Sequence, residues 1–204
     1  MKTRILRIAA ASVLAIAVSA GIAWWQVRNA ATTVESGTKS AVPIGGPFTL
    51  TDHTGKSVTD ADFRGKYMLI YFGYTYCPDV CPTELGVMTQ ALDRLGPKSE
   101  QVQPIFITID PDRDTVAHMK DYVSLFHPRL VGLTGTPEQV REAARAYRVY
   151  YAKAPQKDGK ADDYLMDHSS FIYLMGPDGT FVGVYPGGTT ADKIVQDLSS
   201  RIAG

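Results

Sequence analysis

The stretch Tyr71-Phe-Gly-Tyr-Thr-Tyr-Cys-Pro-Asp-Val-Cys-Pro-Thr-Glu-Leu85 holds the only two cysteines of the chain, Cys77 and Cys81. An apolar run (68–72) leads into this stretch, and apolar residues at helical spacing follow it. The pattern predicts a strand, a short loop and then a helix, with both sulfurs near the start of the helix.

The spacing of the two cysteines predicts that their thiols act together. Four residues along a helix turn about 400° and rise about 6 Å, so we expect both thiols on one face. The positive end of the helix dipole favours thiolate at this position. Pro78 and Pro82 fall where a backbone N–H would lack an intrahelical partner in any case. Such a pair can form a disulfide, attack one in another molecule, or hold a soft metal ion.

Two uses of the cysteine pair need no metal. A structural disulfide is common in exported proteins, but a bridge across this spacing closes a very small loop and adds little stability. A thiol–disulfide oxidoreductase is the stronger alternative. Enzymes of the thioredoxin type have two residues between their cysteines, whereas residues 78–80 separate them here. This spacing weighs against a general disulfide enzyme but not against thiol exchange.

Three further motifs follow the cysteine stretch: Asp110-Pro-Asp-Arg-Asp-Thr115, Asp167-His-Ser-Ser170 and Gly176-Pro-Asp-Gly179. Together with Tyr-Phe-Gly-Tyr-Thr-x-Cys-Pro-Asp-x-Cys-Pro, they closely resemble the Sco/SenC family of thioredoxin-like copper proteins. The resemblance runs from Phe48 to the end of the chain. One departure is Val116, where the family often has proline, and it casts no doubt on the expected metal site.

The resemblance implies one copper ion, as Cu(I) or Cu(II), held by Cys77, Cys81 and His168. Cu(I) prefers soft thiolate and imidazole donors, whereas structural zinc usually takes four protein ligands. Asp167 is expected either to hold His168 in one tautomer from behind the site or to point to water. Asp110, at a strand end, is expected to orient the cysteine loop or to cap the next helix.

The other polar and aromatic residues near these motifs are expected to have structural roles. Asp79, between the cysteines, is predicted to be a solvated loop acid. The tyrosines that lead into the cysteines are predicted to be packing residues rather than redox groups. Three histidines are predicted not to be ligands, and they are His53, His118 and His127.

Composition indicates a folded protein that does not bind nucleic acid. Apolar residues make up 45% of the 204 residues and the formal net charge is zero, which excludes a disordered chain. Without the four basic residues Lys2, Arg4, Arg7 and Arg28, the remainder has 17 basic and 21 acidic residues. An acidic domain of this kind has no electrostatic basis for binding a phosphate backbone.

The N-terminal region predicts a membrane anchor. Residues 1–7 carry three basic side chains, and residues 8–25 contain no charge and end in two tryptophans. We expect a cytoplasmic end (1–7), a single transmembrane helix (8–25), a flexible tether (26–46) and an exported folded domain (47–204). The resemblance implies that this domain lies in the periplasm of a bacterium. The alternative is a signal peptide cleaved after Val18-Ser-Ala20, which we favour less because apolar residues continue beyond it.

The remaining pattern predicts an α/β domain. A hairpin is expected between Phe48 and Val58, a buried strand at 105–109, and an exposed loop from Lys153 to Asp163. Further elements are expected as helices around 116–126, 137–147 and 194–202 and as strands at 67–71, 130–133, 170–174 and 180–185. With the resemblance, these elements imply a thioredoxin-like fold, a central mixed sheet flanked by helices.

The resemblance implies a copper chaperone rather than an enzyme. Its expected partner is subunit II of cytochrome c oxidase, whose dinuclear copper centre would receive the metal. Another copper chaperone is the expected donor, and the N-terminal helix places the domain at the bacterial inner membrane. The alternatives are a thiol–disulfide reductase that keeps the cysteines of the target reduced and a redox or copper sensor.

Overall fold

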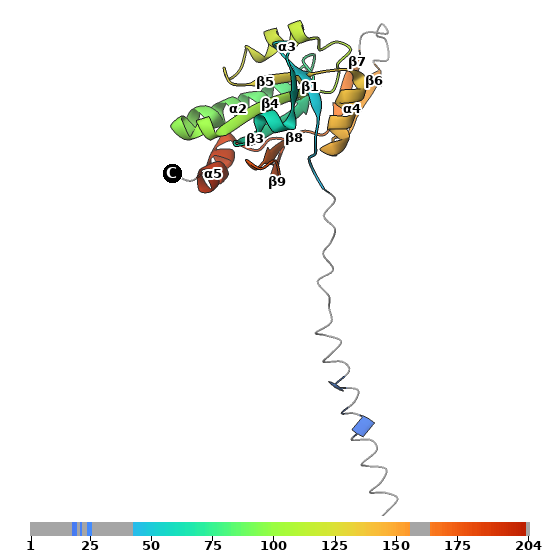
Figure 1. Cartoon of the computed structure of the whole chain (residues 1–204), viewed down its shortest axis with the longest axis vertical. Helices are drawn as coiled ribbons and strands as arrows, with labels where there is room; N and C mark the ends of the chain where they lie inside the picture. Colours follow the sequence, from blue (N-terminus) through green and yellow to red (C-terminus); the bar gives the residue numbers. More distant parts are fainter. Residues whose placement is uncertain (1–17, 20, 22–23, 26–42, 156–163, 203–204) are drawn as a thin grey trace, which may run out of the picture. The chain divides into compact units, whose positions relative to one another are not determined.

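The computed structural model describes residues 18–19, 21, 24–25, 43–155 and 164–202 (Figure 1). Contacts divide the chain into two units, Met1–Val42 and Pro43–Gly204. The described residues of the first unit are helical and exposed. Among all described residues, no helix is both long enough and apolar enough to span a bilayer. The predicted anchor and tether lie mainly outside the described residues, so they stay predictions.

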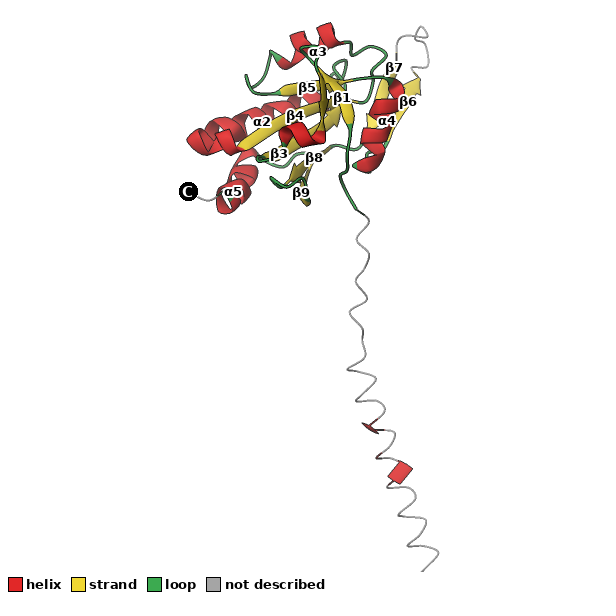
Figure 2. Cartoon of the chain, viewed as in Figure 1, coloured by secondary structure: helices red, strands yellow, loops and turns green. Residues whose placement is uncertain are grey.

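The second unit is an α/β domain (Figure 2). Its strands are β1 (Thr49–Asp52), β2 (Ser57–Thr59), β3 (Tyr67–Gly73), β4 (Val102–Thr108), β5 (Val131–Thr134), β6 (Tyr151–Pro155), β7 (Tyr164–His168), β8 (Phe171–Met175) and β9 (Phe181–Pro186). Its helices are α2 (Val80–Leu95), α3 (Val116–Val123), α4 (Pro137–Ala146) and α5 (Ala191–Arg201), with 3₁₀ turns η1 (Asp60–Phe63) and η2 (Gly96–Gln101).

Seven strands form one mixed sheet in the order β2-β1-β5-β4-β3-β8-β9. The central pair, β3 and β4, is parallel, with Ile70 opposite Ile105, and β8 runs antiparallel to β3. Strand β3 is a continuous apolar run, β4 is apolar from Pro104 to Ile107, and the side chains of both are almost all buried, the pattern of strands covered on both faces. Helix α2 packs against α5, α3 against β5, and α4 against β1. The predicted mixed sheet flanked by helices is therefore confirmed.

Local sequence patterns predicted most helices and strands at the positions where the structure has them. The hairpin of β1 and β2, the strands β3, β4, β5, β8 and β9, and the helices α3, α4 and α5 lie where the pattern predicts them, within a few residues. At the start of α4, the Thr136 hydroxyl accepts a hydrogen bond from the Gln139 amide, and the Gln139 side chain accepts one from the Thr136 amide. This reciprocal arrangement is the capping box that the sequence indicates.

The prediction that both cysteines share one helix face is wrong. Helix α2 begins at Val80, with Asp79 as its N-cap residue, so Cys77 lies in the preceding loop. Cys77 precedes Pro78 and lies outside the helix, whereas Cys81 precedes Pro82 and lies within its first turn, so the conformational preference of a residue before proline does not by itself set this boundary. The two sulfurs nevertheless lie within 4.8 Å of each other, and the Cys81 amide donates a hydrogen bond to Cys77 Sγ at 3.4 Å.

The predicted loop from Lys153 to Asp163 is wrong at its start. Tyr151–Pro155 forms β6, which pairs antiparallel with β7 as a separate two-stranded sheet. Tyr151 lies opposite His168 in this register. The apolar patterning of this segment is weak, and the segment is stabilised by pairing with β7. Residues 156–163, between the two strands, lie outside the described part of the chain.

The end of β3 approaches α2 so closely that only glycine fits at position 73. A Cβ atom added to Gly73 would lie 2.7 Å from Cys81 Sγ, 3.0 Å from the Phe106 ring and 3.1 Å from the Tyr71 ring. These neighbours are all fully buried and cannot move aside into solvent. The glycine therefore sets the depth at which the Cys81 sulfur lies.

We predict that Gly73→Ala lowers the free energy of unfolding by about 1–3 kcal/mol, the usual cost of overpacking a core. Urea denaturation of the reduced protein measures this change. Gly86→Ala on α2 is the matched control, because no heavy atom lies within 4 Å of its added Cβ. It should raise stability by about 0.5–1 kcal/mol through helix propensity. An unchanged unfolding midpoint for Gly73→Ala would contradict the close approach.

Candidate metal centre

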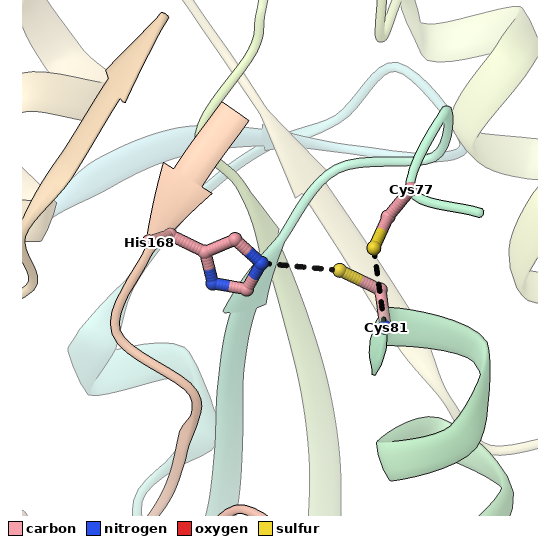
Figure 3. A group of neighbouring side chains, drawn as sticks. All are labelled: Cys77, Cys81 and His168. Atoms are coloured by element: carbon pink, nitrogen blue, oxygen red, sulfur yellow. Dashed lines mark hydrogen bonds between the residues drawn. The ribbon is translucent and has the colours of Figure 1, made fainter. Parts of the chain in front are cut away.

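Three side chains from separate segments converge at one end of the sheet (Figure 3). Cys77 lies in the loop after β3, Cys81 in the first turn of α2, and His168 at the end of β7. One potential ligand atom from each lies within 4.8 Å of the others, and His168 Nε2 is 3.4 Å from Cys81 Sγ. Both cysteines are free thiols and buried, with Cys77 8% exposed and Cys81 0%.

The imidazole of His168 is oriented by its neighbours. Its Nδ1 lies 3.1 Å from the carbonyl oxygen of Ser169, and a carbonyl can only accept, so the proton resides on Nδ1. The lone pair of Nε2 then faces the sulfurs. The rings of Tyr71 and Tyr74 meet the imidazole edge-on, with centroids 6.2 and 6.0 Å away. The histidine is thus presented in the tautomer that a metal ion needs.

The pKa values of the two thiols are shifted in opposite directions. A hydrogen bond from Cys81 lowers the pKa of Cys77, and contacts with His168 and the amides of Asp79 and Cys81 lower it further. The same interaction with Cys77, together with burial, raises the pKa of Cys81. The pair therefore carries one proton at neutral pH, with the charge on Cys77 and the proton on Cys81.

A cavity of about 300 Å³ opens beside these side chains. Two segments form its walls: the cysteine loop and strand β7. Its lining residues are Tyr74, Cys77, Pro78, Asp79, Val80, Leu165, Met166, Asp167 and His168. Cys81 does not line it. Access to the group of three therefore passes the thiolate of Cys77 and the imidazole of His168.

The buried carboxylate of Asp114 holds the cysteine loop. It accepts hydrogen bonds from the Thr75 amide (3.1 Å), the Thr75 hydroxyl (2.5 Å) and the Thr108 hydroxyl (2.6 Å). Burial raises the pKa of Asp114, and these hydrogen bonds act against the rise. Since Thr75 lies two residues before Cys77 and Thr108 ends β4, the carboxylate joins the loop to the sheet.

A second polar cluster holds the strand that carries His168. Asp110, only 1% exposed, accepts a hydrogen bond from the Tyr164 hydroxyl at 2.7 Å and forms an ion pair with Arg113. The Arg113 guanidinium donates to the Tyr164 carbonyl at 3.0 Å and lies 3.7 Å from the centre of its ring. Tyr164 begins β7. The cluster thus joins the strand of His168 to the loop after β4.

Arg113 also contacts the cysteine loop. Its guanidinium lies 4.7 Å from the centre of the Tyr76 ring, and His118 stacks on the same ring at 5.0 Å. Tyr76 is the residue before Cys77. One arginine therefore touches both segments that supply the group of three, the cysteine loop and β7. Local sequence signals did not identify Arg113, Asp114 or Tyr164.

The structure distinguishes the roles expected for the two aspartates. Asp110 contacts Tyr164 and Arg113, so its carboxylate secures the hairpin of His168 rather than the cysteine loop directly. Asp167 is exposed and lines the cavity. Within the described part of the chain, the recorded partner of His168 Nδ1 is the Ser169 carbonyl, which takes the position proposed for Asp167.

The remaining histidines lie apart from the group. His53 Nδ1 accepts a hydrogen bond from the Gly132 amide, and His127 Nδ1 accepts one from the Arg129 amide. His118 stacks on Tyr76. These contacts agree with the structural roles expected for all three.

Comparison with known proteins shows the family. The family model described as SCO1/SenC matches residues 36–203. The chain belongs to the SCO1/SenC family. It is 49% identical over 160 residues to the mitochondrial SCO2 homolog of Mus musculus, covering 78% of this chain and 62% of that protein. The chain thus spans less than two thirds of the length of that curated relative.

Solved structures of the family have the same fold. The structure of Bradyrhizobium japonicum ScoI with copper bound is 49% identical, with a TM-score of 0.71 and coverage of 78% of this chain and 99% of that one. BsSco is described as a member of the Sco family of cytochrome c oxidase assembly proteins in which a disulfide switch was identified. It is 26% identical, with a TM-score of 0.61, and the match covers 79% of this chain and 95% of that one.

We predict that iodoacetamide modifies Cys77 selectively, at a rate nearly independent of pH between 6 and 8. The lowered pKa keeps Cys77 as thiolate throughout this range, whereas an ordinary thiol gains about tenfold in rate per pH unit below its pKa. Mass spectrometry of the reduced, metal-free protein measures both sites. Cys81→Ala removes the Cys81 thiol, which is the largest cause of the lowered pKa, and should make the rate rise more steeply with pH, although the amides of Asp79 and Cys81 remain as donors. Equal labelling of both cysteines would contradict the assigned charge.

We predict that Tyr164→Phe loosens the β6–β7 hairpin. It leaves the buried Asp110 oxygen without its hydroxyl donor, which costs about 1–3 kcal/mol, and amide exchange in β7 should accelerate. Hydrogen exchange with mass spectrometry measures this effect.

Tyr185→Phe is the matched control, because the Tyr185 hydroxyl donates to Asp197 at the same distance, 2.7 Å, on β9 and α5. It should leave exchange in β7 at the wild-type rate. Equal acceleration in both variants would show that the cluster acts only through global stability.

Proposed function

We propose that the protein binds one copper ion through Cys77, Cys81 and His168 and delivers it to another protein. The observation that carries the proposal is the convergence of two sulfurs and an imidazole lone pair within 4.8 Å. Thiolate and imidazole are ligands that copper accepts at low coordination number. Among the described residues, no fourth His, Cys, Asp or Glu joins the group, and structural zinc usually takes four.

The protonation state of the Cys77–Cys81 pair suits the binding of a metal cation. Cys77 already carries negative charge, so it provides the first contact, and Cys81 gives up its proton when its sulfur coordinates. The complete set of two thiolates and one neutral imidazole has a net charge of −1 with Cu(I) and zero with Cu(II). Both oxidation states are therefore electrostatically acceptable. The released proton makes affinity fall at low pH.

The acceptor we propose is the dinuclear copper centre of cytochrome c oxidase subunit II. The copper-bound relative and the described role of BsSco in oxidase assembly support this choice. An anchor at residues 8–25 and a tether at 26–46 would hold the domain near such a membrane-bound partner in the periplasm and raise their effective concentration. Transfer proceeds by ligand exchange, as thiolates of the acceptor replace those of the donor.

Thiol–disulfide exchange is a second candidate, favoured by the lowered pKa of Cys77. In this reaction the Cys77 thiolate attacks a disulfide of the target, forms a mixed disulfide and releases one target thiolate. Cys81 then loses its proton and attacks Cys77, which frees the second target thiolate. Two electrons pass to the target, and the Cys77–Cys81 disulfide forms. His168 has no required role in these steps, so it separates the two candidates.

We predict that the reduced full chain in detergent binds one copper tightly and that His168→Ala weakens this binding at least a hundredfold. Removing one of three ligands leaves a two-coordinate dithiolate that competing chelators strip readily. Anaerobic titration against a chromophoric chelator, with thiolate-to-copper charge-transfer absorption, measures the change. His53→Ala, outside the cluster, is the control and should bind as wild type. If His168→Ala bound copper as wild type does and retained disulfide exchange, the result would favour thiol–disulfide exchange as the function.

A further inference from the structure

Strand β7 carries one more soft donor, Met166, near the candidate site. Burial alternates along the strand, with Tyr164 and Met166 buried, Leu165 and Asp167 exposed, and His168 half-buried. Alternate residues of a strand lie on one face, so Met166 shares the face of His168 and Tyr164. The other two residues of this face have polar partners. The Tyr164 hydroxyl donates to Asp110, and His168 Nε2 lies beside Cys81 Sγ.

Met166 lines the cavity onto which two of the candidate ligands, Cys77 and His168, open. It borders this space together with Cys77, His168 and Tyr74, and it is 7% exposed. Its position two residues before His168 corresponds to about 7 Å along the strand, which the flexible side chain of methionine can bridge because it has three rotatable bonds.

The same methionine also borders a second cavity, of about 190 Å³, on the side of β6 and α4. That space lies between strand residues such as Ala152 and helix residues such as Pro137. Met166 is the one residue common to the linings of these two cavities. Met166 therefore separates the two cavities, and a side chain with three rotatable bonds at this position has a cavity on either side.

We propose that Met166 is a fourth, displaceable copper ligand, and this inference rests on the copper-binding function proposed above. A thioether is neutral and soft, so it adds a donor for Cu(I) without changing the charge of the site. Weak thioether ligation is also a means by which proteins tune copper centres. When an acceptor thiolate enters, Met166 withdraws toward the second cavity and vacates a coordination position.

The alternative role for Met166 is apolar packing, and the two roles respond differently to leucine. Leucine conserves volume and costs less than about 1.5 kcal/mol in a core, but it cannot coordinate copper. A packing role therefore predicts wild-type copper chemistry in Met166→Leu. A ligand role predicts a changed copper environment in a protein of nearly unchanged stability.

The test compares the full chain in detergent, wild type and Met166→Leu, each loaded anaerobically with one equivalent of Cu(I). X-ray absorption at the copper edge should show an additional, longer copper–sulfur distance in wild type that the variant lacks. Competition with a Cu(I) chelator should show about tenfold weaker retention in the variant. Retention of Cu(II), which prefers harder donors, should change less than Cu(I) retention. Met166→Gln, which substitutes a harder oxygen donor, should shift the charge-transfer band of the Cu(II) form.

The matched control is Met88→Leu, a methionine 1% exposed on α2, seven residues and about 10 Å of helix beyond Cys81. It should bind copper as wild type does. Identical absorption spectra and chelator competition in wild type, Met166→Leu and Met88→Leu would overturn the inference while leaving the copper-binding proposal intact. Absence of tight copper binding in wild type would overturn both.

Discussion

The buried carboxylate of Asp114 is the interaction on which the candidate site depends. A short loop follows β3 and carries Cys77 to the first turn of α2, where the Cys81 amide donates to its sulfur. The carboxylate provides an anchor for this loop by accepting three hydrogen bonds, two from Thr75 and one from Thr108. Because all these groups are buried or half-buried, losing the acceptor would leave several donors unpaired, which is costlier than the hydrogen bonds themselves are worth.

A second constraint brings His168 to the cysteines across 87 residues of sequence. The β6–β7 hairpin lies outside the seven-stranded sheet, and its end that carries His168 lies three residues before β8, which pairs with β3 in that sheet. The cluster of Asp110, Arg113 and Tyr164 holds the other end of β7, with an ion pair, a hydroxyl donor and a guanidinium over an aromatic ring. The Asp110-to-Thr115 motif thus serves both halves of the site, through Asp110 for the hairpin and Asp114 for the loop.

The sequence predicts best those elements that are determined by residues close together in the chain. The apolar run before Cys77, the helical spacing after Cys81 and the capping box at Thr136 all predict elements that the structure contains. The proximity of His168 came from resemblance to a family, because the hairpin that carries it has weak patterning. Nothing in the Asp110–Thr115 motif indicates which aspartates are buried. Asp110 and Asp114 are, whereas Asp112 is exposed, and tertiary packing alone decides this.

The asymmetry of the two cysteines has a consequence for the copper transfer proposed above. Cys81 is fully buried behind Gly73, whereas Cys77 lines the cavity with His168. A thiolate from an acceptor must therefore approach on the side of Cys77 and His168. Once the proposed Met166 ligand has withdrawn, exchange would continue at these two ligands, and Cys81 would dissociate last, regaining the proton that its raised pKa favours. Reprotonation of the last sulfur removes a competing ligand, so the acidity difference within the pair favours completion of the transfer over return of the metal.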